Sequence, residues 1–154
     1  MLRTLIFIIC VAPLLLLTAC SYRFDFVVTN KSGKPIEVRY QLKRYTPETP
    51  EKFVDTNPPA KLSEEEFKKF EHHWHELSKG QYDFDTRTGM YTVSVTPDEV
   101  LLVDFAYNYQ GTESEFDLAS IQITGAYGSI ELHGREAQTS FAYESNRTYV
   151  IRYR

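Results

Sequence analysis

The sequence predicts a mainly β protein: an antiparallel β-sandwich of about eight strands with one inserted amphipathic helix. Apolar and polar residues alternate with a period of two along most of the chain after residue 20, which indicates strands with one buried face. Turn-forming residues separate these segments at short intervals. Aromatic residues, which favour strands, make up 14% of the 154 residues. Because the apolar residues alternate rather than run continuously, the pattern argues against a parallel α/β sheet.

The first two expected strands lie at 22–28 and 36–42. Aromatic and aliphatic residues at every second position of 22–28 share one face, and Arg23 and Asp25 share the other. Turn-forming residues at 30–35 connect the two segments. The pair is therefore expected to form a hairpin with one solvent-exposed face.

Further alternating segments continue to the end of the chain. In 101–109 the odd-numbered residues are apolar or aromatic and are expected on the inner face, whereas Asp104 is expected on the outer face. The regular spacing of strands is typical of an immunoglobulin-like or transthyretin-like sandwich. The other expected strands lie at 91–95, 121–123, 130–132, 141–143 and 149–153, with a weaker one at 82–84.

One stretch departs from the alternation. Residues 45–61 contain four of the seven prolines and are expected to form a surface loop. A helix is expected from about Ser63 to Ser78, because Ser63 and Glu66 have the spacing of a capping box. Its apolar residues fall on one stripe that is expected to pack on a sheet face or on one end of the core: Phe67, Phe70, Trp74 and Leu77.

The N-terminus has the pattern of a short secretory signal. Arg3 supplies a positive charge, and an apolar run at 5–17 follows, interrupted only by Pro13. The next residues, Leu17-Thr18-Ala19-Cys20, resemble the bacterial lipobox. In that motif a Leu, a small residue and an Ala precede the bond that is cut, and a Cys follows it.

The lipobox resemblance implies that residues 1–19 are a removable signal peptide and that residues 20–154 form a single domain tethered through Cys20. By the family pattern, the Cys20 thiol takes a diacylglycerol and the new amine takes an N-acyl chain. Ser21 stands where the enterobacterial sorting pattern has a retention aspartate, which implies the outer membrane, with the domain facing the periplasm. Two alternatives stay open: ordinary cleavage with Cys20 unmodified, and an uncleaved single span, for which the run is short of the required ~20 residues.

Two histidines on the expected helix form a candidate metal site. His72 and His75 are three residues apart on its outward side, so both can reach one Zn²⁺, Cu²⁺ or Ni²⁺, and Glu71 can add an oxygen. A metal site needs three or four ligands, and His133, the only histidine outside the cluster at 72–75, is distant in sequence. The alternative is a solvated helix face with a Glu71–His75 pair.

The surplus of aromatic residues suggests a ligand groove. Tyr109 and Gln110 end the long segment 101–109 and lead into a polar loop, and tyrosine beside adaptable polar residues is common in binding sites. The alternative, which the count of core positions favours, is that Tyr107 and Tyr109 pack inside the sandwich.

No enzymatic activity is expected from this sequence. A nucleophile with a base and an orienting acid is not evident, and Asp83 and Asp85 are more simply the polar face of a strand than a pair of catalytic carboxylates. The net charge of −4 argues against a nucleic-acid partner. The expected function is a non-enzymatic binding or assembly module of the cell envelope, held on the membrane by its lipid and meeting an envelope protein as partner.

Two other functions are kept beside it. One is a periplasmic metal-binding lipoprotein that uses His72 and His75. The other is an accessory lipoprotein of a secretion system: the ten residues Gly33–Leu42, followed by a helix inserted in a β-sandwich, are similar to the outer-membrane lipoprotein of type VI secretion.

Overall fold

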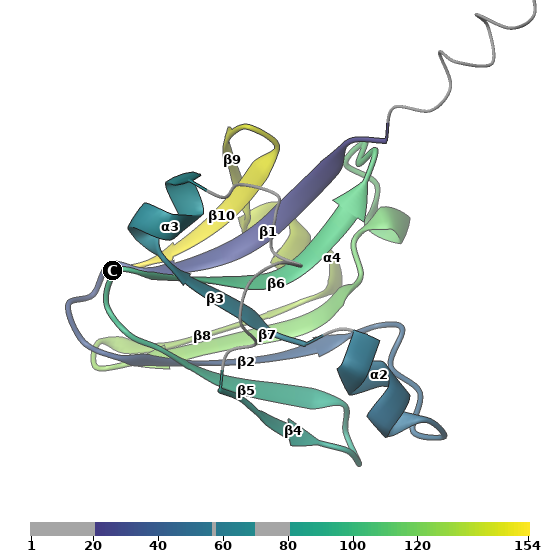
Figure 1. Cartoon of the computed structure of the whole chain (residues 1–154). Coiled ribbons are helices and arrows are strands. Elements are labelled where there is room, and N and C mark those ends of the chain that lie inside the picture. The colour runs from purple at the N-terminus through teal and green to yellow at the C-terminus, as the bar shows by residue number, and fades with distance from the viewer. Residues whose placement is uncertain (1–20, 57, 70–80) are drawn as a thin grey trace, which may run out of the picture.

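A computed structural model describes residues 21–56, 58–69 and 81–154. Within these residues, ten strands form two five-stranded sheets that pack face to face as a sandwich (Figure 1). The predicted fold class, a mainly β sandwich with antiparallel pairing dominant, is confirmed. The strand count is higher than the expected eight because two short edge strands, one of them unexpected, are added.

Sheet A contains both ends of the described chain. Its strands in spatial order are β3 (Ala60–Ser63), β6 (Glu99–Tyr107), β1 (Arg23–Asn30), β10 (Thr148–Tyr153) and β9 (Ala142–Ser145). Strands β1 and β10 pair in parallel, whereas the other neighbours in this sheet are antiparallel. Strand β1 is central and its residues Phe26, Val27 and Val28 are 0% exposed, so it is buried on both faces.

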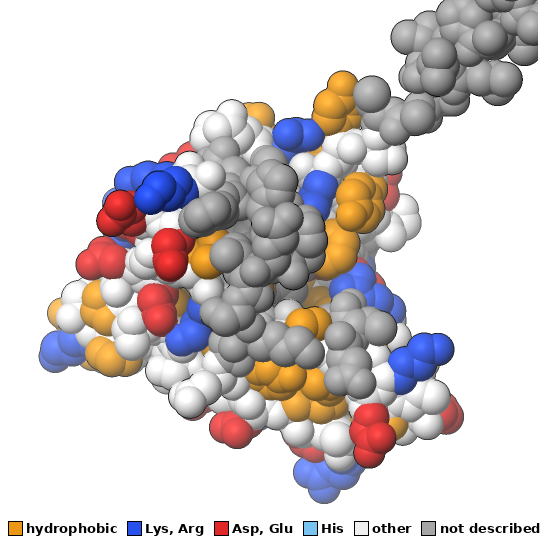
Figure 2. Space-filling model, in the orientation of Figure 1, with side chains coloured by type: hydrophobic (Ala, Val, Ile, Leu, Met, Phe, Trp, Pro, Cys, Tyr) orange, Lys and Arg blue, Asp and Glu red, His pale blue; other side chains and the backbone are white. Residues whose placement is uncertain are grey.

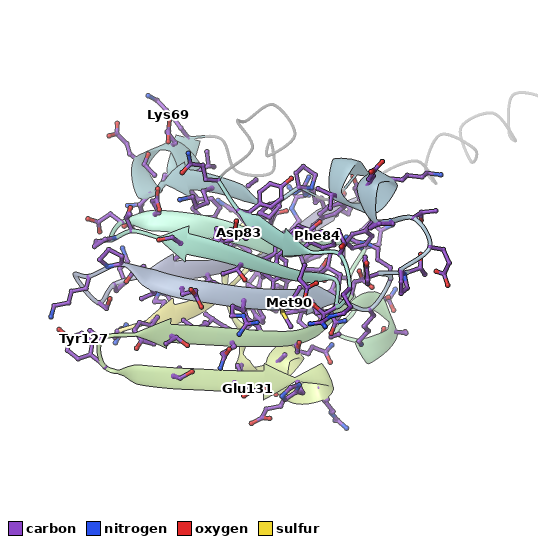
Figure 3. All side chains as sticks on the ribbon, turned by 90° about the horizontal axis from the view of Figure 1, so that it is seen from below. Lys69, Asp83, Phe84, Met90, Tyr127 and Glu131 are labelled. Carbon is purple, nitrogen blue, oxygen red and sulfur yellow. The ribbon has the colours of Figure 1, made fainter. Side chains whose placement is uncertain are left out.

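Sheet B is antiparallel throughout. Its strands in spatial order are β4 (Asp83–Asp85), β5 (Met90–Val95), β2 (Ile36–Leu42), β7 (Leu118–Gly125) and β8 (Gly128–His133). The predicted alternation of β2 is confirmed, since its even-numbered residues are buried while Glu37 and Arg39 are exposed. Figure 3 looks onto this sheet and shows Asp83 and Glu131 near its two edges.

The expected hairpin between the first two strands is wrong. Strand β1 belongs to sheet A and β2 belongs to sheet B, so the turn at 31–35 carries the chain from one sheet to the other. Asn30 fixes this crossing: its side-chain amide donates to the carbonyls of Lys34 and Val95, at 2.7 and 2.8 Å. The face of β1 that was expected in water carries Asp25, which is 0% exposed.

The helices in the described residues are short. They are α2 (Pro50–Thr56), α3 (Glu64–Lys69) and α4 (Gly134–Ser140), with a 3-10 turn η2 at Glu113–Glu115. None of them is long and apolar enough to cross a bilayer. Helix α2 and the start of strand β3 occupy part of the stretch 45–61 that was expected to be a loop, because Phe53 and Ala60 are buried there against the sandwich.

The predicted start of the inserted helix is confirmed. The Ser63 hydroxyl accepts from the backbone amide of Glu66, and the Glu66 carboxylate accepts from the amide of Ser63, at 3.2 and 3.0 Å. These two bonds are the capping box expected from the sequence. Phe67, the first residue of the predicted apolar stripe, packs on the outer face of sheet A against a small cluster that includes Val27 and Val100. The rest of the predicted helix lies outside the described residues.

Most aromatic residues pack inside the sandwich. One group of rings surrounds Tyr91, which stacks on Tyr40 with centroids 5.1 Å apart. Another surrounds Phe26, which meets Phe116 edge-on at 5.0 Å. Such tilted and edge-on pairs stabilise a core beyond the area they bury. The surplus of aromatic residues is therefore used largely for packing.

A β-bulge in β6 changes which residues face the core. Phe26 pairs with Asp104 but the next residue, Val27, pairs with Leu102, so Val103 is the extra residue. Beyond the bulge the alternation is inverted. Phe105 packs on the outer face of sheet A, and Tyr107 is 59% exposed. The expectation that both lie on the inner face with Leu101 is wrong for this reason.

Candidate functional site

Four residues with a predicted role lie outside the described residues: Cys20, the predicted lipidation site, His72 and His75, the predicted metal ligands, and Glu71, which was expected to add an oxygen. Their roles stay predictions. Within the part of the chain that the structure describes, no group of three His, Cys, Asp or Glu side chains is placed to hold a metal ion. His133 lies on the exposed edge strand β8, with its Nε2 atom 3.1 Å from a Glu131 carboxylate oxygen.

The predicted ligand-binding pair lies at the margin of the core. The ring of Tyr109 meets Phe26 edge-on at 5.1 Å, and its hydroxyl accepts from the Gln138 side-chain amide at 2.7 Å. Gln110 is exposed, and its backbone amide donates to the Glu115 carboxylate at 2.8 Å. These contacts hold the loop after β6 against α4, so Tyr109 has the packing role that was the alternative. Binding of a ligand by this pair stays a prediction.

The carboxylates of β4 lie on the solvent side, as expected. Asp83 and Asp85 are exposed, and Phe84 between them packs against Tyr91 with ring centroids 4.6 Å apart. The Asp85 carboxylate accepts from the Arg87 amide and the Thr88 hydroxyl, which lowers the pKa of the carboxyl below its usual value. Asp85 therefore organises the β4–β5 turn.

Asp104 is a buried titratable group whose importance the sequence did not reveal. The bulge at Val103 turns this side chain inward, where it is 3% exposed. Its two carboxylate oxygens accept from the backbone amides of Phe105 and Asp117, at 2.8 and 2.9 Å. Burial nevertheless dominates, because it disfavours the charged form, and it raises the pKa of the Asp104 carboxyl to about 6.

Asp104 belongs to a polar cluster that closes this end of the core. The Asp117 carboxylate forms an ion pair with the Arg44 guanidinium at 2.8 Å and also accepts from the Arg44 backbone amide at 3.2 Å. Burial raises the pKa of the Asp117 carboxyl, and Arg44 opposes that rise. Burial, the neighbouring Tyr91 and the Asp104 carboxylate together raise the pKa of the Tyr40 phenol well above its usual value.

A small cavity borders the same cluster. It measures about 30 Å³ and is lined by Tyr40, Arg44, Pro58 and Asp104 among others. A cavity of this size has room for a water molecule but not for a substrate. Because burial raises the pKa of the Asp104 carboxyl to about 6, this carboxyl can gain or lose a proton near that pH. Its hydrogen bond to the Asp117 amide connects the bulge of β6 to the chain just before β7. We interpret the role of Asp104 as structural: it holds the segment before β7 against the bulged part of β6.

The chain enters the fold at the start of β1. The backbone amide of Tyr22 donates to the Asn108 side-chain oxygen, and the amide of Asn108 donates to the Tyr22 carbonyl, at 2.8 and 2.7 Å. These bonds continue the β1–β6 pairing by one residue beyond the strand. Tyr22 is thus held to sheet A, and only Ser21 lies between it and Cys20, the predicted lipidation site.

The fold and site define a two-sheet β-sandwich whose first strand follows immediately on a signal-like segment. Comparison with family models, with curated proteins and with solved structures finds no match to this chain. The functional argument therefore rests on the residues themselves.

Proposed function

We propose that this protein is a lipid-anchored lipoprotein of the bacterial cell envelope that works as a non-enzymatic binding or assembly module. The observation that carries the proposal is the motif Leu17-Thr18-Ala19-Cys20 directly ahead of a folded domain. Strand β1 begins at Arg23, three residues after Cys20. An extended chain of that length spans about 10 Å, so an acylated Cys20 holds the sandwich close to the bilayer.

Acyl chains on Cys20 supply enough affinity for a stable tether. Each buried CH₂ group contributes about 0.8 kcal/mol, so a single chain binds a membrane reversibly while two or three hold a domain permanently. By the lipobox pattern, Cys20 carries a diacylglycerol and an N-acyl chain. The outer membrane, with the sandwich in the periplasm, is the location that Ser21 after the Cys favours.

Exposed sheet edges support the binding role. Strand β8 ends sheet B and β9 ends sheet A, and helix α4 connects them in sequence. All four residues of β9 are exposed, as is β8 apart from Leu132. Ile130 on β8 and Tyr143 on β9 are apolar residues left 41% and 59% exposed. Sheet edges of this kind accept strands or loops of partner proteins.

The proposal predicts that fatty acid enters the protein at Cys20 alone. Cells that express the full chain are fed an alkyne analogue of palmitate, and the captured protein is reacted with a fluorescent azide. The wild type and Cys10→Ser are expected to carry the label, since Cys10 lies in the predicted signal peptide. Cys20→Ser is expected to lose it.

Cys10→Ser is the matched control because it removes a thiol from the same segment without touching the motif. Label that persists in Cys20→Ser, or a wild type that takes up none, contradicts the proposed anchor. Globomycin, which inhibits the lipoprotein signal peptidase, is expected to leave the wild type at the mass of its precursor.

A further inference from the structure

Two tyrosines and one arginine lie together where the chain enters the fold. Tyr22 is 53% exposed and lies two residues after Cys20. Tyr107, the last residue of β6, is 59% exposed and pairs with Arg23 on the neighbouring strand. Arg147, in the turn between β9 and β10, places its guanidinium 5.2 Å from the centre of the Tyr22 ring. We call Tyr22, Tyr107 and Arg147 the anchor corner.

The anchor corner is held firmly to sheet A. The carbonyl of Arg147 accepts from the backbone amide of Asp25 at 3.0 Å, which fixes the β9–β10 turn beside the start of β1. Tyr107 also meets the Phe105 ring edge-on, with centroids 5.9 Å apart. Figure 2 shows hydrophobic and basic side chains gathered around the start of β1.

The second arginine of this region does not add a free charge. The Arg23 guanidinium forms an ion pair with Asp25 at 2.6 Å and lies over the Phe105 ring at 4.3 Å, and its side chain is only 14% exposed. Arg147 is only partly buried and makes a cation–π contact rather than an ion pair with Tyr22. The corner therefore presents one positive charge beside the Tyr22 ring, and the exposed Tyr107 ring lies at the end of the neighbouring strand β6.

This combination is suited to the surface of a bilayer. Tyrosine is enriched at membrane interfaces, because its ring is apolar and its hydroxyl can hydrogen-bond at headgroup level. A basic side chain near an anionic surface is attracted electrostatically to the headgroups. The two-residue step from Cys20 to Tyr22 spans at most about 7 Å when extended, which keeps the corner within reach of the headgroups.

We infer that the anchor corner rests on the membrane, with the Tyr22 and Tyr107 rings among the headgroups and Arg147 against anionic phosphates. The inference rests on the proposed lipidation of Cys20 and deepens it, because it assigns the protein a fixed orientation. A tether alone leaves the sandwich free to tumble. With the corner seated, the opposite end of the sandwich points away from the bilayer.

Tyr127 marks that opposite end and offers a matched control. It is 67% exposed in the turn between β7 and β8. The neighbouring Gly128 carbonyl accepts from the Tyr153 hydroxyl at 2.8 Å, at the C-terminal end of β10, which runs parallel to β1. Figure 3 shows Tyr127 at the far end of its hairpin, away from Met90 at the start of β5.

The test compares labels at the two ends of the lipidated protein. Full-length Tyr107→Cys and Tyr127→Cys chains are expressed with their leader, purified in the mature form and reacted with a maleimide fluorophore. They are then reconstituted into vesicles of phosphatidylethanolamine with a minority of phosphatidylglycerol that carry spin-labelled headgroups. Both tyrosines are exposed, so neither change is expected to unfold the domain.

Quenching by the spin-labelled headgroups is expected to be about threefold stronger at position 107 than at position 127. Equal quenching at both positions overturns the inference while leaving the lipid anchor in place. The wild type, with Cys20 acylated, is expected to take up no maleimide label. A wild type that is labelled at Cys20 overturns the anchor and the inference together, so the two failures are distinguishable.

A charge reversal tests the role of Arg147 separately from that of the rings. In the Tyr107→Cys background, Arg147→Glu is expected to reduce the quenching by about half, because it repels anionic headgroups. Arg154→Glu makes the same change of charge at the C-terminus, beyond Tyr153 at the opposite end of the sandwich, and is expected to leave the quenching unchanged. An equal effect of the two reversals contradicts a specific contact by Arg147.

Discussion

At the scale of single residues, Asp104 shows how one extra residue in a strand creates a buried acid. The bulge at Val103 turns the carboxylate inward, and two backbone amides then hold it. The raised pKa of about 6 means that the folded chain binds a proton more tightly than the unfolded chain does. The stability that this group contributes is therefore greatest in acid and falls as the pH rises.

The replacement Asp104→Asn is expected to remove that dependence on pH. Between the usual value of 3.8 and a folded-state pKa of about 6, the free energy of unfolding of the wild type loses about 3 kcal/mol relative to the variant as the pH rises. Urea unfolding of both proteins at several pH values from 4 to above 6 measures this difference. Parallel curves for the two proteins contradict the assignment.

Asp85→Asn is the control of opposite sign. Hydrogen bonds from Thr88 and Arg87 lower the pKa of the exposed Asp85 carboxyl. A lowered pKa stabilises the fold above the unfolded-state value, and that stabilisation is lost as the pH falls through the folded-state value. As the pH rises toward the usual value of 3.8, the wild type is therefore expected to gain stability over Asp85→Asn, whereas above that value it loses stability relative to Asp104→Asn.

At the scale of elements, the turn between β4 and β5 depends on a glycine. Gly89 has a φ of 74°, and a Cβ atom there would overlap the Tyr45 ring. The Tyr45 hydroxyl donates to the carbonyl of Thr86 in the same turn, so the ring cannot move away without losing that bond. The turn thus joins sheet B to the chain that follows β2.

Gly89→Ala is expected to lower the free energy of unfolding by about 2–4 kcal/mol, from the left-handed backbone and the overlap together. Gly111→Ala is the matched control, because Gly111 has a φ of 85° but no atom near the added Cβ. Only the backbone cost of about 1–2 kcal/mol is expected there. Equal losses in the two variants, measured by urea unfolding, contradict the role given to Tyr45.

The elements also show what the sequence determines locally and what it does not. The alternation in β2 correctly places Ile36, Val38 and Tyr40 in the core, because no bulge interrupts it. The same rule misplaces Phe105 and Asp104, since a single bulged residue inverts every position after it. For this reason the sequence did not point to Asp104 as a candidate site. A carboxylate at a position expected to face solvent does not indicate a buried or functional group.

At the scale of the whole molecule, strand pairing is the feature that local pattern did not reveal. Alternation shows that β1 and β2 are strands, but the crossing between sheets depends on the Asn30 side chain and on distant partners such as β10. The two-sheet architecture was predictable because ten amphipathic strands can bury their apolar faces only in layers. The order of strands within each sheet was not predictable, since many orders satisfy the same alternation of apolar and polar residues.

The whole molecule also has two unlike ends. One end receives the chain from Cys20 and carries the anchor corner, while the other carries the β7–β8 turn and the C-terminus. A lipid on Cys20 determines which of the two ends meets the bilayer. The exposed edges β8 and β9 run between the two ends and stay accessible in this orientation.

The central claim is that acyl chains on Cys20 hold this sandwich against a membrane. Mass spectrometry of the tryptic peptide Cys20–Arg23 from the membrane-extracted protein tests it most directly. The account predicts a peptide that begins at Cys20 and carries a diacylglycerol on sulfur and an acyl chain on its amine. A peptide with a free thiol at Cys20, or a chain that retains residues 1–19, would contradict it.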